Sequence, residues 1–123
     1  MAVIATDKAP AAIGPYSQAI TANGFVYLSG QLGLVPETGK LAEGGTLEQA
    51  KRIFRNIAAV LDAAGSKPEN VVKTTCFLTD LGDFAAFNAL YAEFFTGKPA
   101  RSCVEVSKLP LGGSVEVEVI ATI

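Results

Sequence analysis

Arg101 is the side chain in this 123-residue sequence best suited to hold a small anion. It follows Pro99 and Ala100 at the start of a predicted strand. A planar guanidinium can bind a carboxylate through two parallel hydrogen bonds, and a hydrogen bond to a charged group contributes roughly 1.5 to 3 kcal/mol. The spacing leaves a second interpretation open, in which Arg101 forms an ion pair with Glu105 or with a carboxylate of the last strand.

Three further residues could take part in chemistry. Glu116 and Glu118 share one face of the last predicted strand, and a partly buried carboxylate there could transfer protons, although the same pattern is also typical of a solvated face. Cys103 could be a nucleophile. No histidine and no helix N-terminus is in view to lower the pKa of its thiol, so a small buried apolar role is the alternative.

Composition excludes several classes of function. The absence of histidine removes His-based triads and the usual zinc sites. No P-loop, GxGxxG, paired CxxC or RNP motif is present, so we expect neither a metal nor a cofactor. Lys and Arg number 10 against 12 Asp and Glu, a net charge of -2 that disfavours nucleic acid as a partner. The chemistry must therefore use Arg, Glu, Cys, Tyr, Ser or the backbone.

The elements that must position these residues follow from periodicity. Residues 16–21 and 25–29 read as two strands around Asn23-Gly24, which is a strong hairpin signal. Residues 36–45 read as a loop. A capping box at Thr46 and Gln49 opens a helix with apolar residues every three to four positions, ending near Gly65.

The second half of the chain also contains predicted strands and a helix. Residues 71–79 predict a strand, and Asp83 is placed to cap a helix over residues 84–95. Strands over 101–107 and 115–123 follow, joined by a connector at 108–113 that is too long to make them neighbours by default. The order predicts an α+β fold, a mixed sheet with both helices packed on one face.

The whole chain predicts one domain over residues 1–123. Half of its residues are hydrophobic, more than a small monomer can easily hide, so we expect a homo-oligomer that buries one sheet face. Cys76 and Cys103 are far apart in the sequence and lie in strand-like segments. We therefore do not expect a disulfide framework. With no signal peptide and no apolar run of about 18 residues, we expect a cytoplasmic protein without a membrane partner.

Several segments together resemble the Rid family, also called YjgF or L-PSP. They are AAIGPYSQA (residues 11–19), YLSGQ (27–31), VVKTTCFLTDLGDFAAFNALYAEFF (71–95), PARSCVEVSKLP (99–110) and VEVEVIA (115–121). The match runs nearly end to end. The resemblance implies a chorismate-mutase-like fold and a homotrimer with clefts between subunits. It also implies hydrolysis of the reactive enamines and imines released by pyridoxal-phosphate enzymes, giving 2-oxo acids and ammonia.

Carried over to this sequence, the resemblance makes Arg101 the anchor of the substrate carboxylate and places Cys103 beside it. It makes Glu116 the residue that positions or activates water. The other cleft positions that match are Tyr16, Ser29, Gly30 and Asn88. The connector between helix and strand at residues 96–98 is shorter than in some family members. The resemblance therefore does not fix the shape of the cleft rim there.

Two alternatives belong to other classes of function. A trimer that binds 2-oxo acids without turning them over would need only Arg101 and backbone donors. Endoribonuclease activity or translation inhibition is attributed to some relatives, and the acidic composition counts against it.

Overall fold

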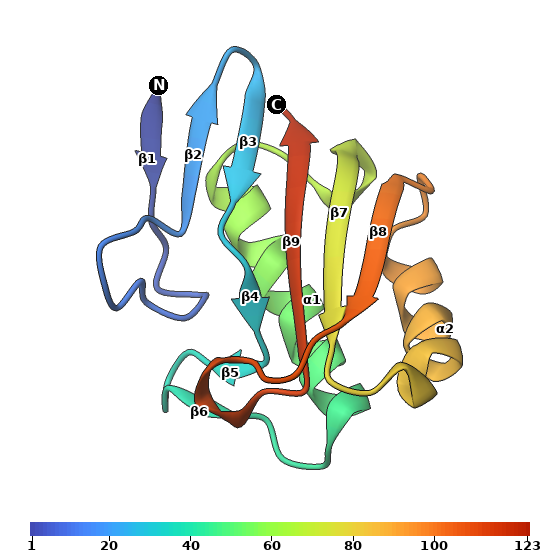
Figure 1. Ribbon diagram of the computed structural model, residues 1–123. Coiled ribbons are helices and arrows are strands. Elements are labelled where there is room, and N and C mark those ends of the chain that lie inside the picture. Colours follow the sequence, from blue (N-terminus) through green and yellow to red (C-terminus); the bar gives the residue numbers. More distant parts are fainter.

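The chain alternates short strands with two helices (Figure 1). The structure, a computed structural model, describes residues 1–123. Its strands are β1 (Ala2–Ile4), β2 (Ala19–Ala22), β3 (Phe25–Leu28), β4 (Gln31–Leu32), β5 (Leu34–Val35), β6 (Lys40–Leu41), β7 (Val71–Leu78), β8 (Ala100–Glu105) and β9 (Val115–Thr122). Its helices are α1 (Thr46–Ala63) and α2 (Phe84–Phe94), with 3₁₀ turns at Pro68–Asn70, Leu81–Asp83 and Pro110–Gly112.

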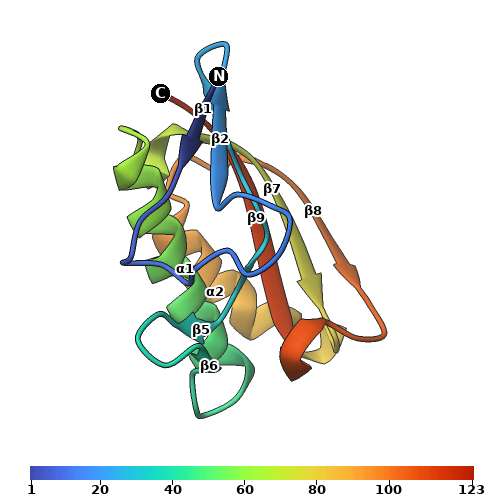
Figure 2. The same ribbon diagram turned by 90° about the vertical axis from the view of Figure 1, so that its left-hand side faces the viewer.

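One mixed sheet has the strand order β1-β2-β3-β9-β7-β8, with β4 also pairing with β9. Strands β7 and β8 are parallel and are joined through α2, whereas the other pairs are antiparallel. Figure 2 shows both helices on the same face of this sheet. The predicted α+β architecture is therefore confirmed. The last two strands are not neighbours, because β7 lies between β8 and β9.

The hydrophobic core lies between the sheet and the helices. Every second residue of β9 is buried in it, and α1 turns its apolar stripe toward them. The largest fully buried side chains include Ile53, Ile57, Leu61, Phe87, Val115, Val117 and Val119. Buried residues recur every second position on β9 and about every 3.6 positions on α1. This spacing gives each element one apolar face, and the two apolar faces pack together.

The predicted capping box at the start of α1 is wrong. Gly45 occupies the N-cap position, and no side chain caps the helix. The hydroxyl of Thr46 instead shares a hydrogen bond of 2.7 Å with that of Ser114, and Oε1 of Gln49 accepts one from the Ser114 amide. These side chains tie α1 to the turn before β9, a long-range contact that local spacing cannot reveal.

The predicted cap of α2 is also wrong. Asp83 has helical backbone angles and makes no cap hydrogen bond. Asp80 caps the preceding 3₁₀ turn instead, since its Oδ1 accepts a 2.7 Å hydrogen bond from the amide of Gly82. The extra turn at Leu81–Asp83 moves the cap three residues upstream.

Several strand boundaries differ from the predictions, and the strand predicted over 101–107 ends at Glu105 as β8. The strand predicted over 16–21 begins only at Ala19, because the residues before it belong to a long loop. The segment predicted as loop over 36–45 contains β6, which pairs with β5 as a small separate ribbon. Strand β1 pairs with β2 and had no clear sequence signal.

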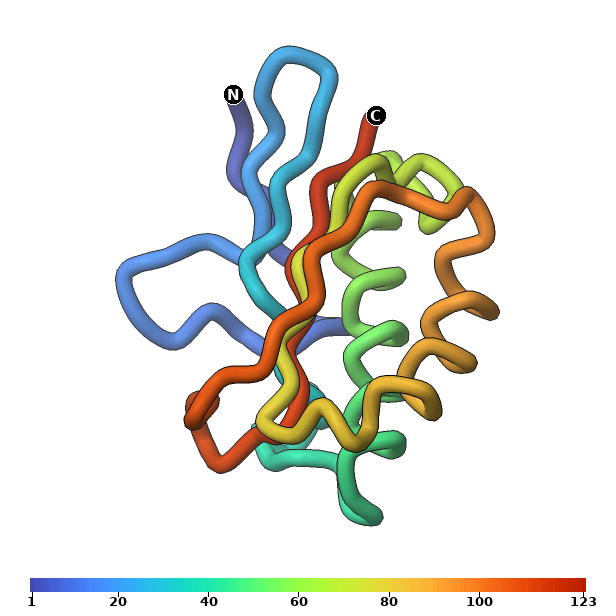
Figure 3. The backbone as a smooth tube through the Cα atoms, turned by 45° about the vertical axis from the view of Figure 1, so that its right-hand side comes forward, coloured from blue at the N-terminus to red at the C-terminus, as the bar shows by residue number.

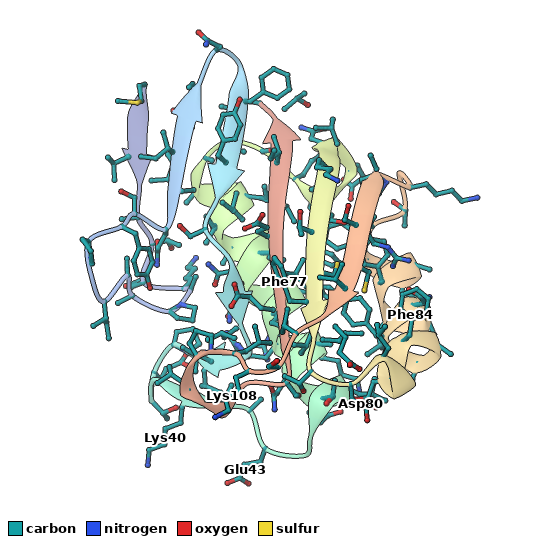
Figure 4. The ribbon with its side chains drawn as sticks, in the orientation of Figure 1. Lys40, Glu43, Phe77, Asp80, Phe84 and Lys108 are labelled. Carbon is teal, nitrogen blue, oxygen red and sulfur yellow. The ribbon has the colours of Figure 1, made fainter.

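The other face of the sheet has no helix over it. Phe25, Tyr27 and Val104 on this face are 36%, 44% and 44% exposed. In Figure 4, Phe77 lies on the uncovered face, whereas Phe84 belongs to α2 on the other side. Neither α1 nor α2 has the length and apolar composition of a membrane-spanning helix. The exposed apolar side chains on this uncovered face are of the kind that packs against another protein surface.

Candidate functional site

A bulge between β3 and β4 lies at the centre of the first part of the site. Tyr27 pairs with Ile120, and Gln31 pairs with Val117, so four steps along this strand oppose three along β9. The extra residue falls at Ser29-Gly30, between the two short strands. Bulges of this kind redirect backbone groups beside functional sites.

Gly30 leaves the space that Glu116 occupies. A Cβ atom at Gly30 would contact Oε2 of Glu116 and lie 2.9 Å from its Cδ. The carboxylate therefore lies directly against the backbone of the bulge. The identity of Gly30 is explained by close approach of another group.

A cavity of about 700 Å³ opens over this contact. We call it the Glu116 pocket. Besides its apolar residues it is lined by Gln18, Ser29, Gly30, Gln31, Glu116 and Glu118. Its apolar wall comes from two loops and the strands beside the bulge, with Pro10, Ala11, Ile13, Tyr16, Leu32, Leu34, Pro110 and Leu111.

The pKa of Glu116 is raised. Burial is the larger cause, because it disfavours the charged form, and the nearby charge of Glu118 adds to it. Glu118 itself is exposed. Of the two glutamates, Glu116 thus has the environment, part burial beside a second carboxylate, that favours a role in proton transfer.

Arg101 lies in a second cluster, between β8 and α2. Its Nη1 donates a 2.6 Å hydrogen bond to Oδ1 of Asn88. The guanidinium carbon lies 4.7 Å from the ring centre of Tyr91 and 5.3 Å from that of Phe84, so two aromatic rings hold the cation. These four residues, named here the Arg101 cluster, combine a fixed guanidinium with N–H groups left for a ligand.

Further contacts hold the Arg101 cluster in place. The hydroxyl of Tyr91 shares a buried 2.7 Å hydrogen bond with that of Thr74 on β7. The ion pair considered between Arg101 and Glu105 is not formed: Oε1 of Glu105 accepts from the amide of Leu81, and the chain's salt bridge joins Lys51 to Glu48. Arg101 thus keeps its charge without a carboxylate partner in the chain.

Cys103 and Cys76 lie opposite each other on β8 and β7, and both are free thiols. Burial raises the pKa of Cys76 to about 12, and Cys103 adds to that rise. Burial also raises the pKa of Cys103, although the charge of Arg101 opposes it. Both side chains are therefore protonated thiols near neutral pH, in an environment that does not favour a thiolate nucleophile.

Arg101 and Glu116 point to opposite faces of the sheet. Arg101 aligns with Thr74, whose buried side chain faces the helices, whereas Glu116 aligns with Phe77 on the uncovered face. The Glu116 pocket contains Tyr16, Ser29 and Gly30 but none of Arg101, Cys103 and Asn88. One copy of the chain therefore holds the predicted site residues in two separate groups, which we call half-sites.

The hydroxyl of Ser29 already donates a 2.6 Å hydrogen bond to the Ser17 carbonyl. Its amide donates to the carbonyl of Gln18 at 3.0 Å. Tyr16 is 54% exposed at the mouth of the pocket. Ser29 can thus accept a hydrogen bond from a ligand, while its own protons hold the neighbouring loop.

Sequence reasoning missed the two aromatic residues beside Arg101, because Phe84 and Tyr91 matched the apolar stripe of a helix. Asn88 lies between them on the same helix, four residues from Phe84 and three from Tyr91. A polar residue in that stripe was the available signal that α2 faces a charged group. No group of three or more Cys, Asp or Glu side chains is arranged to hold a metal ion.

Comparison with known proteins gives consistent matches. The family described as Endoribonuclease L-PSP matches residues 6–123. Reactive Intermediate Deaminase A, chloroplastic, of Arabidopsis thaliana is 49% identical over 122 residues, covering 98% of this chain and 65% of that longer protein. The 2-iminobutanoate/2-iminopropanoate deaminase of Mus musculus is 50% identical over 120 residues, 97% of this chain and 89% of the relative.

The fold agrees with solved structures as well. The crystal structure of E. coli TdcF with bound serine superposes with a TM-score of 0.94 at 38% identity, covering 100% of this chain and 99% of that one. The family model matches residues 6–123, and the mouse relative is 50% identical over 97% of this chain. The chain therefore belongs to the L-PSP family, also called Rid.

Proposed function

We propose that this protein is an imine deaminase that hydrolyses 2-iminobutanoate and 2-iminopropanoate, the imine forms of 2-aminocrotonate and 2-aminoacrylate. Relatives about 50% identical carry the names of this activity. The observation that carries the proposal is the pair of half-sites, a fixed unpaired guanidinium and a half-buried carboxylate with a raised pKa. The products are a 2-oxo acid and ammonia.

Arg101 binds the substrate carboxylate. Asn88 occupies one N–H of its guanidinium and the rings of Tyr91 and Phe84 fix its plane, so the remaining N–H groups are already oriented. Prior orientation lowers the entropy lost when the ligand binds. Cys103 lies on the same strand face and shapes the wall beside the carboxylate. Serine, the ligand bound in the TdcF structure, carries an α-carboxylate as the proposed substrate does.

Glu116 acts on the water. The imine carbon is already electrophilic, so the oxygen of water forms a bond to it while the carboxylate of Glu116 takes the water proton. The electron pair of the C=N bond moves to nitrogen, and both protons of the water end on that nitrogen, the first by way of Glu116 and the second when the new hydroxyl becomes the carbonyl. The carbon–nitrogen bond then breaks, and ammonia leaves as the 2-oxo acid forms. The backbone at Gly30, the hydroxyl oxygen of Ser29 and Tyr16 complete the wall around the substrate.

The reaction requires a second copy of the chain. Because the two half-sites face opposite sides of the sheet, the Arg101 cluster of one subunit must meet the Glu116 pocket of the next. Repeating this head-to-tail contact closes a ring. The homotrimer implied by the resemblance meets this requirement, and the uncovered face with Phe25, Tyr27 and Val104 supplies apolar surface for it. Light scattering on a sizing column should give about three times 12.8 kDa.

A coupled assay tests the activity. A pyridoxal-phosphate dehydratase acting on threonine or serine generates the enamine, and release of ammonia or 2-oxo acid is followed with and without this protein. We expect faster release with it. If the rate equals that of the buffer while calorimetry shows binding of pyruvate or 2-oxobutyrate, the protein is a 2-oxo acid binder and the enzyme proposal fails.

A further inference from the structure

Gln18 is a buried polar side chain that the proposed reaction does not use. It is 4% exposed and directly precedes β2. Its Oε1 accepts a 2.7 Å hydrogen bond from the amide of Thr6. Its Nε2 lies 3.0 Å from the Thr6 carbonyl, 2.8 Å from that of Pro10 and 3.4 Å from that of Ala9. One amide group thus contacts four backbone atoms from a single stretch of chain.

That stretch is an irregular segment between β1 and β2, residues 5–18. Figures 2 and 3 show it passing around the sheet, from the side of α1 to the uncovered side. Its backbone makes few bonds of its own: the amide of Tyr16 donates to the carbonyl of Gly14. Since buried backbone groups need partners, the Gln18 amide takes the place of a β-ladder here.

The same segment forms one wall of the Glu116 pocket. Pro10, Ala11, Ile13 and Tyr16 line the cavity, and so does Gln18 itself. Ile13 is 87% exposed, so its own packing cannot hold it in place. The two ends of this wall are held instead, at Thr6 and Pro10 by Gln18 and at Ser17 by the hydroxyl of Ser29.

We propose that Gln18 is a positioning residue, whose amide clamps residues 5–18 and thereby sets Tyr16 against the substrate in the Glu116 pocket. The kinetic part of this inference rests on the proposed imine hydrolysis. The structural part does not.

Two variants test the clamp. Gln18→Leu keeps the side-chain size and removes every hydrogen bond. Gln18→Glu keeps the acceptor for the Thr6 amide but cannot donate to the carbonyls of Thr6 and Pro10, so it serves if the leucine variant does not fold. Ser66→Ala is the matched control, because it removes one partly buried hydrogen bond, 2.6 Å to the Thr122 carbonyl, at the other end of β9.

Hydrogen exchange of the assembled protein, read by mass spectrometry, is the first measurement. We expect exchange in peptides covering residues 5–18 to rise at least about tenfold in either Gln18 variant, with α1 and β7 unchanged. The Ser66→Ala control should leave residues 5–18 protected. Unchanged protection of this segment in the Gln18 variants would overturn the clamp, whether or not the protein hydrolyses imines.

A double-mutant cycle on kcat/KM for the imine is the second measurement. Gln18→Leu and Tyr16→Ala should each lower kcat/KM about tenfold, mainly by raising KM, and the double variant should lose little more than either single one. Losses that multiply, or no loss from Tyr16→Ala alone, would overturn the link between the clamp and the pocket. A parent protein without imine hydrolysis would contradict the proposed function, and the exchange result would still decide the clamp.

Discussion

The Arg101 cluster and the Glu116 pocket lie on opposite faces of one sheet and are held by different kinds of structure. Arg101 lies on a strand and is fixed by a helix, through the Asn88 hydrogen bond and two aromatic rings. The Glu116 pocket depends on a bulge at Gly30 and on loops around it. Regular elements thus position the group that we propose binds the substrate, and irregular segments surround the group that we propose acts on the water.

This difference has a physical reason. A guanidinium that holds a ligand benefits from a rigid setting, because each rotation lost beforehand is not lost on binding. A carboxylate that accepts a proton needs an environment that shifts its pKa, and loops can bury it partly while leaving access for water. The variants below separate the two requirements.

Replacement of Glu116 by Gln should have the largest effect. The amide keeps the shape and removes the proton acceptor, so we expect a loss of about 10²-fold or more in rate with 2-oxo acid binding retained. Rates from the coupled assay and binding by calorimetry provide the check. A rate equal to the parent's would remove Glu116 from the chemistry.

The same variant bears on stability. Because the folded state raises the pKa of Glu116, the folded protein binds more protons than the unfolded chain between the two pKa values. The free energy of unfolding therefore falls as pH rises through that interval. Glu116→Gln should abolish this fall, which urea unfolding at several pH values would show.

Arg101→Lys should reduce activity roughly tenfold to a hundredfold, corresponding to about 1.4 to 3 kcal/mol. Lysine keeps the charge but cannot reproduce the planar fork or its stacking on Tyr91. The expected signature is a weaker affinity for pyruvate by calorimetry together with the lower rate. Parent-like kinetics would mean that another group recognises the carboxylate.

Gly30→Ala should lower the rate about tenfold while the protein stays folded. The new methyl group would meet the end of a flexible side chain, the Glu116 carboxylate, which can move away from its working position. Gly33→Ala is the contrasting control, since its Cβ would lie 2.7 Å from the backbone of Gln49 and must shift α1. Thermal unfolding should thus report a large loss for Gly33→Ala and a small one for Gly30→Ala. The reverse order would contradict this account of the bulge.

Glu118→Gln should change the pH dependence more than the maximal rate. The charge of Glu118 helps to raise the pKa of Glu116, so its removal lowers that pKa. The acid limb of the pH–rate profile should move to lower pH, while the rate near neutral pH changes little. An acid limb that does not move would show that another group controls it.

Cys103→Ser should have the smallest effect, a change in rate within about twofold. Water attack on an imine needs no covalent adduct, and burial keeps the Cys103 thiol protonated. The steady-state rate is measured beside the oligomer mass. Abolished activity in a variant whose oligomer mass equals that of the parent would identify Cys103 as the nucleophile.

Local patterns predicted much of the fold. The stripe of α1, the alternation of β9 and the Asn23-Gly24 hairpin are all found in the structure. Errors occurred where a polar residue bonds to a distant segment. Thr46 and Gln49 contact Ser114 rather than their own helix. The Gln18 side chain binds the loop before β2, and the Ser17 carbonyl accepts from the Ser29 hydroxyl, so neither residue extends β2.

The sequence by itself determined the family, the kinds of residue available for chemistry and the faces of the main elements. Those properties depend on residue identity and on spacing over a few positions, which a linear chain displays directly. The tertiary structure decided that Arg101 stacks on Phe84 and Tyr91. It also decided that the Glu116 carboxylate occupies the space beside Gly30, and that Arg101 and Glu116 lie on opposite faces of the sheet. Each of these depends on which strands pair and in which register, because one step of register exchanges the two faces of a strand.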